Sequence, residues 1–347
     1  MREKVSSQAS DQAARASGQG SARWLRRSAL AGALAWVAVL LPPWPFTEHI
    51  LWIERIVILG PLVIAPLALF LAGLGLRPGP AARCHALAAR CQPLGAALGL
   101  VALYPRPGLL AGALAGGWLL VTGLFALCGL TRLFTRGLGP IQELAIDAGL
   151  LYLPVGGVWL VASRLGIPFL GFSEPWVMLT AAHFHYAGLA APVIAGAVGR
   201  ALHRALHAPA SSLGRGWLRA YVVAAAGVMA GPPLVAAGIA LWPVVEVVSA
   251  AVLSLALLLL TAVALRAVVP RMRPRRAGAL LAVAVSSLLL SMSCACAYAV
   301  GAFLQIDILL LPTMVWVHGL VNAIGFGAGG LCAFAMATPD DASWGQT

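Results

Sequence analysis

Long apolar stretches alternate with short polar segments along nearly the whole chain. Most are close to the roughly 20 residues that an α-helix needs to cross a bilayer, and runs of this length predict membrane helices rather than strands. The predicted spans are 28–46, 50–76, 84–104, 108–131, 143–163, 175–199, 217–241, 243–268, 277–303 and 311–337. We therefore predict an all-α, polytopic transmembrane helix bundle of about ten helices.

Polar and proline residues interrupt some of these stretches. Arg90 and Gln92 lie in the third span and Asp147 in the fifth, while prolines such as Pro61 and Pro154 lie in others. A proline removes one backbone donor, but neighbouring helices satisfy the freed carbonyl in a membrane protein. We expect kinks rather than helix ends at these prolines.

The arginines are distributed unevenly between the two sides of the predicted bundle. They occur in the amino-terminal arm and in every second loop, whereas only Arg55, Arg106 and Arg164 fall toward the other side. Such a bias follows the positive-inside rule and predicts that both termini are cytoplasmic. The even number of spans agrees with this topology.

Three segments follow from the same pattern. Residues 1–27 predict a disordered basic cytoplasmic arm, residues 28–337 the transmembrane helical domain, and residues 338–347 a short cytoplasmic tail. A signal peptide is the competing interpretation of the arm. However, the apolar stretch after it runs into Pro42 and Pro43 instead of a small-residue cleavage site.

Composition and charge agree with a membrane protein. Of 347 residues, 61% are hydrophobic and only 10% are charged, which is too few to cover a soluble protein of this size. The formal net charge of +12 is not accompanied by zinc-finger spacing or interleaved aromatic residues, so we expect no nucleic-acid partner. The expected partner is the lipid bilayer, and the expected location is a bacterial inner membrane, crossed several times.

A small set of polar residues lies inside the predicted spans, all near the outer end. These residues are Glu54, Arg55, His183, His185, Tyr186, Glu246, His318 and Asn322. An ionisable group at the bilayer centre costs about 2.5–3.5 kcal/mol, so it needs a partner or a function. We predict a binding site at this level. For Glu54, Arg55 and Glu246 the alternative is that they reach water by snorkelling.

The segment His183-Phe184-His185-Tyr186 carries the most specific pattern. Residues i and i+2 of a helix are about 200° apart, so His183 and His185 must serve different partners, and one of them could face His318. Imidazole binds metals, relays protons and hydrogen-bonds to substrates. All three uses stay open here, as does a purely structural hydrogen bond.

The same segment resembles the helix of haem-copper oxidase catalytic subunits on which two histidines ligate different haems. Those oxidases also need a copper-binding histidine cluster, whereas most other histidines here lie in loops. We therefore do not expect oxygen reduction. A single haem or a copper ion bound by His183 or His185 with His318 remains open. Sulfur ligands for a copper site occur at the same level, in Met292, Cys294 and Cys296.

Two carboxylates lie in the cytoplasmic half of the fifth span. Asp147, with Glu143, can pair with Arg132 or Arg136, or it can take part in a proton relay toward the outer site. We favour the pairing.

Two segments together carry a family resemblance. Residues 179–188 (LTAAHFHYAG) and 316–326 (WVHGLVNAIGF) resemble the YndJ family of bacterial polytopic membrane proteins. The resemblance extends in character over residues from about 30 to 337 and implies a transporter-like protein. It supports the following site residues: His183, His185, His318 and Asn322.

Three functions remain in competition. The chain has no Walker loop, dinucleotide fingerprint, nucleophile elbow or H-E-x-x-H motif, so we do not expect an enzyme of these kinds. We favour a carrier of a small solute or ion that binds at the outer polar level. The alternatives are a haem- or copper-binding redox or sensor protein, and a scaffold whose histidines only bond neighbouring helices.

Overall fold

The structure is a computed structural model that describes residues 2–41, 52–209 and 212–338, with the backbone alone for residues 2–18. The predicted tail at 338–347 lies outside the described residues except for Thr338. The same holds for the junction between the first two predicted spans, at 42–51.

The described residues form ten continuous helices, several of which contain a wider π-helical segment (η). In order they are α1 (Arg2–Leu40); α2 (Trp52–Leu59), η1 (Gly60–Ile64) and α3 (Ala65–Gly73); α4 (Pro80–Val101); α5 (Leu109–Arg136); α6 (Ile141–Leu165); α7 (Trp176–His183), η2 (Phe184–Ala190) and α8 (Ala191–His207); α9 (Gly216–Leu241); α10 (Pro243–Val263), η3 (Ala264–Val268) and the 3₁₀ turn η4 (Val269–Arg271); α11 (Arg275–Leu304); and α12 (Leu311–Thr313), η5 (Met314–Gly319), η6 (Val321–Ala328) and α13 (Gly329–Ala337). The expected all-α bundle is confirmed, and the described residues contain no strand.

Eight of these ten helices are long and apolar enough to cross a membrane. The other two are α1 and α4, which were predicted as the first and third spans. Helix α4 carries Arg83 and Arg90, and α1 carries the basic arm. That these two also cross the bilayer remains a prediction.

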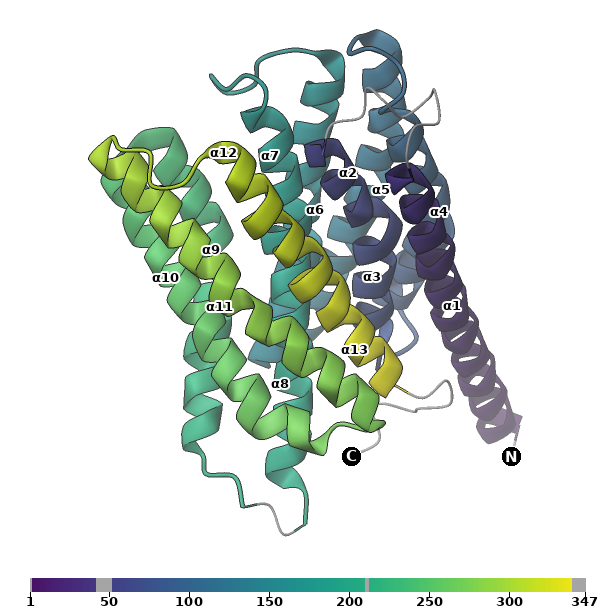
Figure 1. Cartoon of the computed structure of the whole chain (residues 1–347). Helices are drawn as coiled ribbons and strands as arrows, with labels where there is room; N and C mark the ends of the chain where they lie inside the picture. Colours follow the sequence, from purple (N-terminus) through teal and green to yellow (C-terminus); the bar gives the residue numbers. More distant parts are fainter. Residues whose placement is uncertain (1, 42–51, 210–211, 339–347) are drawn as a thin grey trace.

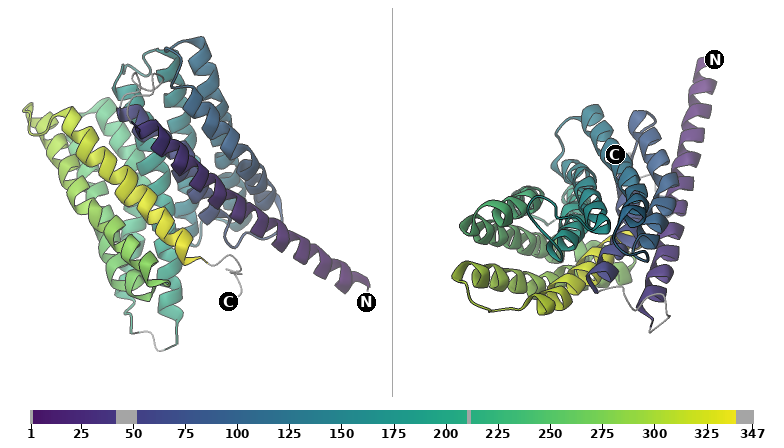
Figure 2. Two further views of the ribbon diagram at one scale, coloured as in Figure 1. Left: turned by 45° about the vertical axis from the view of Figure 1, so that its right-hand side comes forward. Right: turned by 90° about the horizontal axis from the view of Figure 1, so that it is seen from above.

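Helix α1 differs from the sequence-based expectation at its start. It begins at Arg2, so the backbone of the segment 1–27, expected to be disordered, is helical from its second residue. Alanine, arginine and glutamine, which recur in this segment, have high helix propensity. The amino-terminal part of α1 projects beyond the rest of the bundle (Figure 2).

The Arg2 end of α1 and the Ala337 end of α13 lie toward the same end of the bundle (Figure 1). An even number of crossings produces this geometry. That this end faces the cytoplasm remains a prediction from the arginine distribution.

The helix formed by α2, η1 and α3 lies at the centre of the bundle. About 94% of its apolar window is buried, against 33% for α9 and α11, which lie at the periphery with α10 (Figure 1). It contacts α1, α4, α8, α13, η2 and η6. A helix that is apolar on all sides is stable only where other helices surround it.

Polar side chains of α4 satisfy carbonyls of this central helix. Pro66 has no N–H to offer, and the carbonyl of Pro61 instead accepts a hydrogen bond of 2.8 Å from Gln92 Nε2. His85 Nε2 lies 3.0 Å from the carbonyl of Leu69, near the end of α3. Gln92, which interrupts the third predicted span, therefore stabilises the second together with His85.

Candidate functional site

His183 and His318 meet although they come from distant parts of the sequence. His183 ends α7 and His318 lies in η5, and their ring centroids are 6.2 Å apart. Ser291 of α11 lies behind His318, with its carbonyl oxygen 2.9 Å and its Oγ 3.1 Å from Nδ1. Asn322 Nδ2 is 3.3 Å from His318 Nε2. We call His183, Ser291, His318 and Asn322 the histidine cluster.

The backbone contact fixes the protonation pattern of His318. A carbonyl oxygen only accepts, so Nδ1 of His318 carries the hydrogen that it donates to Ser291. In the neutral ring, Nε2 is then an acceptor. The His183 side chain is exposed although Ala182 and Phe184 beside it are buried. The cluster therefore combines an acceptor that faces Asn322 Nδ2 with an imidazole at the surface of the helix bundle.

His185 points to the other side of its helix, as the 200° rotation predicts. Its Nε2 accepts a 3.0 Å hydrogen bond from Trp118 Nε1, and its Nδ1 lies 2.7 Å from the carbonyl of Ala181. The side chain is fully buried. The structure thus does not bring His185 into the histidine cluster, because its ring lies against Trp118 on the other side of the helix.

Glu54 forms an ion pair that the sequence did not suggest. Its Oε1 lies 2.6 Å from Nη1 of Arg164, at the end of α6, and both side chains are almost completely buried. Nη2 of Arg164 donates to the carbonyl of Pro105 at 3.1 Å. Glu54 is thus paired inside the protein and does not snorkel to water. The one available signal was that Arg164 is among the few arginines predicted to lie on the outer side.

The Arg55 side chain lies over Trp52. Its guanidinium lies 4.9 Å from the ring centroid of Trp52, and its backbone carbonyl accepts a hydrogen bond from Trp36 Nε1 at 2.7 Å. A cation over an indole face is a favourable contact. Arg55 therefore anchors α2 beside α1 and is not part of the histidine cluster.

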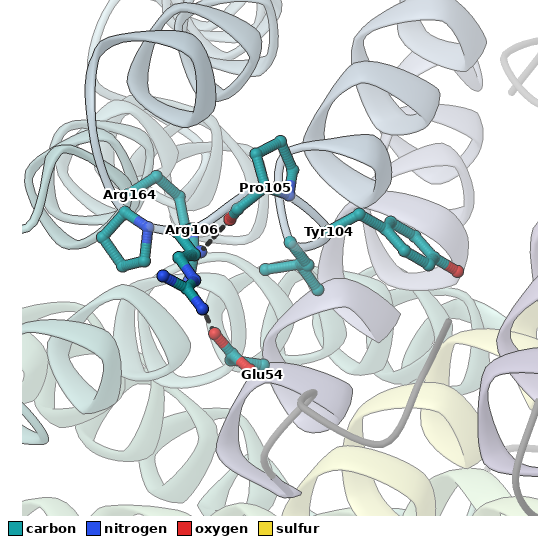
Figure 3. A pocket seen from close by; sticks show the side chains of 7 residues that line it. Glu54, Tyr104, Pro105, Arg106 and Arg164 are labelled. Atoms are coloured by element: carbon teal, nitrogen blue, oxygen red, sulfur yellow. Dashed lines mark hydrogen bonds and ion pairs between the residues drawn. The ribbon is translucent and has the colours of Figure 1, made fainter. Parts of the chain in front are cut away.

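A pocket of about 500 Å³ opens beside the Glu54–Arg164 pair (Figure 3). It is lined by Glu54, Leu103, Tyr104, Pro105, Arg106, Pro107 and Arg164. Its walls come from α2, the α4–α5 connection and the end of α6.

The remaining predicted residues lie apart from the histidines. Glu246 is half-buried in the first turn of α10 and makes no ion pair within the described residues. Cys296 Sγ lies 3.4 Å from Ser254 Oγ of α10. In the part of the chain that the structure describes, no three His, Cys, Asp or Glu side chains gather to hold a metal. The copper site considered from the sequence, with Met292, Cys294 or Cys296 joining the histidines, stays a prediction.

The sequence model of the YndJ-like proteins matches residues 55–326. This chain belongs to the YndJ-like family. It is 27% identical over 238 residues to the "Uncharacterized membrane protein YndJ" of Bacillus subtilis (strain 168). That alignment covers 68% of this chain and 40% of the relative, so the chain spans about two fifths of the relative's length. No solved structure matches it.

The YndJ-like region includes the whole histidine cluster. With its apolar helices, the relationship identifies a multi-pass integral membrane protein. The expected family is confirmed by the match.

The YndJ-like region also contains a buried network of charged side chains at the opposite end of the bundle, which we call the inner ion network. Its members are Arg132, Arg136, Glu143, Asp147 and Arg200. The two oxygens of Asp147 bind Arg132 Nε at 2.5 Å and Arg136 Nη2 at 2.7 Å. The expected pairing of Asp147 is confirmed, with both candidate arginines.

Glu143 extends the network to α8. It binds Arg200 through both oxygens at 2.6 Å and Arg132 Nη2 at 2.8 Å. Arg132 and Arg200 also donate to the carbonyls of Ala72 and Leu71, at the end of α3. Cations stabilise the carboxyl end of a helix, where carbonyls lack partners. The network therefore fastens the central helix to α5, α6 and α8.

π-helical segments surround the histidine cluster in this YndJ-like fold. Segment η2 begins directly after His183, η5 contains His318, and η6 contains Asn322. Segments η1, η2 and η6 contact one another in the bundle. Single π-helical turns often occur at functional sites, because they shift side chains out of the regular helical register.

Tyr186 connects η2 to α2. Its hydroxyl donates to the carbonyl of Ile56 at 2.5 Å. We expect Tyr186→Phe to lower the free energy of unfolding by about 0.5–1.5 kcal/mol, the range for one such hydrogen bond. Denaturation of the purified protein measures this change. Tyr298→Phe is the control, because its hydroxyl has no hydrogen bond among the described residues, and equal losses in both variants would contradict the role of the Ile56 bond.

Proposed function

We propose that this protein is a carrier of a small polar solute or ion and that the histidine cluster binds it. The observation that carries the proposal is the meeting of His183 and His318 beside Ser291 and Asn322, where wide helical segments replace regular helix. Secondary transporters commonly bind their substrates where membrane helices are irregular.

The chemistry of the cluster supports a substrate that donates hydrogen bonds. Nε2 of His318 accepts, and a substrate donor would share it with Asn322 Nδ2 or take its place; the Ser291 hydroxyl can donate or accept, and the Asn322 carbonyl can accept. His183 is exposed and can take up a proton, which would couple binding to proton movement. No carboxylate belongs to the cluster as described, so neutral groups make the contacts.

The test is transport by the full chain in proteoliposomes. Solute uptake from a panel of small polar solutes and cations is followed together with the internal pH. We expect His183→Ala and His318→Ala each to lower uptake at least ~10-fold, since a lost contact of about 1.4 kcal/mol corresponds to that factor. His203→Ala is the matched control, because His203 is an exposed histidine of α8 far along the chain from the cluster.

Two outcomes would contradict the carrier. One is the absence of uptake for the whole panel by folded wild-type protein. The other is equal uptake by His318→Ala and His203→Ala. A haem spectrum or bound copper in wild-type protein that disappears in His318→Ala would instead support the redox or sensor alternative.

A further inference from the structure

Two of the few arginines predicted for the outer side lie at the same pocket. The positive-inside pattern leaves only Arg55, Arg106 and Arg164 on that side. Arg106 and Arg164 line the same pocket, together with Glu54 (Figure 3). The positive-inside rule therefore does not explain the two arginines at this pocket.

The charges of the pocket do not cancel. Glu54 supplies one negative charge, against the two guanidinium groups of Arg106 and Arg164. Arg164 is 4% exposed, and its Nε is buried with no hydrogen-bond partner among the described residues. Its Nη1 and Nη2 bind Glu54 and the carbonyl of Pro105. A buried donor on a charged group requires an acceptor, and an anionic oxygen is the strongest one.

The backbone holds the two arginines in a fixed relation. Arg106 lies at the exposed rim between Pro105 and Pro107, whose rings fix φ on both sides of it. Gly108 N donates to the carbonyl of Arg164 at 2.8 Å, which ties this connection to the end of α6. Little conformational freedom is lost when a ligand bridges two cations that are already positioned.

We propose that this pocket is a binding site for a phosphate group, held between Arg106 at the rim and Arg164 at the base. A phosphate offers several acceptor oxygens, so it can accept from both guanidinium groups at once. The pocket volume of about 500 Å³ leaves room for an organic group attached to the phosphate. The phosphate belongs either to a soluble compound or to the headgroup of an anionic lipid. The proposal is independent of the carrier function.

The experiment compares Arg106→Gln with Arg215→Gln in the full chain. Both arginines are exposed, but Arg215 precedes α9 at the other end of the bundle, so the control removes the same charge elsewhere. In the first arm, thermal unfolding in a neutral detergent is measured against inorganic phosphate, with chloride at equal ionic strength. In the second arm, native mass spectrometry counts phosphatidylglycerol retained from mixed phosphatidylglycerol and phosphatidylcholine nanodiscs.

We expect Arg106→Gln to weaken binding at least ~5-fold in one or both arms, whereas Arg215→Gln matches the wild type. If Arg106→Gln binds inorganic phosphate more weakly than the wild type, the site is assigned to soluble phosphates. If it binds only phosphatidylglycerol more weakly, the site is assigned to a lipid headgroup. Arg164→Lys, which keeps the charge but removes Nε, should weaken the same arm. The proposal is overturned if neither probe binds the wild type, or if Arg106→Gln binds both as Arg215→Gln does.

Discussion

Replacing Asp147 with alanine is expected to lower the free energy of unfolding by about 3–5 kcal/mol, the cost of breaking a buried ion pair by removing one partner. Asp147 is completely buried, and both of its oxygens bind arginine. Arg132, whose side chain is 3% exposed, would lose its shortest contact in an environment without water to replace it.

Unfolding of purified protein by a denaturing detergent measures this loss. Glu246→Ala is the control, because it removes a half-buried carboxylate for which the described residues show no ion pair. We expect that change to cost about 1 kcal/mol or less. The double variant Asp147→Ala with Arg132→Leu should lose less than the sum of the two single variants, since the two side chains contact each other directly. Equal stability of Asp147→Ala and Glu246→Ala would show that the inner ion network does not stabilise the fold.

Trp118→Ala should cost about 3–5 kcal/mol, the range for truncating a large buried aromatic side chain. Trp118 is fully buried and is one of the largest side chains of the core. It packs against Phe125 and His185 and donates to His185 Nε2. The alanine variant therefore opens a cavity and also leaves a buried acceptor without its donor.

Trp118→Phe separates the two causes. It keeps most of the ring volume but removes the donor, so we expect a loss of about 1–3 kcal/mol, the cost of an unsatisfied buried group. Trp242→Ala is the control, because Trp242 is 63% exposed. If Trp118→Ala unfolds at the same denaturant concentration as Trp242→Ala, then Trp118 does not support the core as its burial indicates.

The Trp118 prediction concerns a contact that holds helices in place around the histidine cluster, whereas Asp147 acts at the opposite end of the bundle. His185 fixes one face of η2 to α5 through Trp118, which leaves His183 on the opposite face toward His318. Gly60 and Gly156 allow this packing, because a Cβ at either position would lie 2.8–2.9 Å from the His185 ring. The buried histidine thus has a structural part in presenting the exposed one.

The sequence alone determined where the helices lie along the chain and which side chains of one helix point in opposite directions. Spans predicted at 217–241 and 311–337 agree with α9 at Gly216–Leu241 and with the last helix at Leu311–Ala337. These features depend on the length of apolar runs and on the fixed rotation per residue, which are local properties. The opposite directions of His183 and His185 followed from the same rotation.

Only the tertiary structure decided which polar groups meet. Glu54 finds Arg164, His185 finds Trp118, and His318 finds Ser291, and none of these partners was chosen from the sequence. Each pair joins different helices, and its contact depends on how those helices pack and how far each is rotated about its axis. Apolar helix surfaces allow many such packings, so hydropathy placed the polar residues at one depth without assigning their partners.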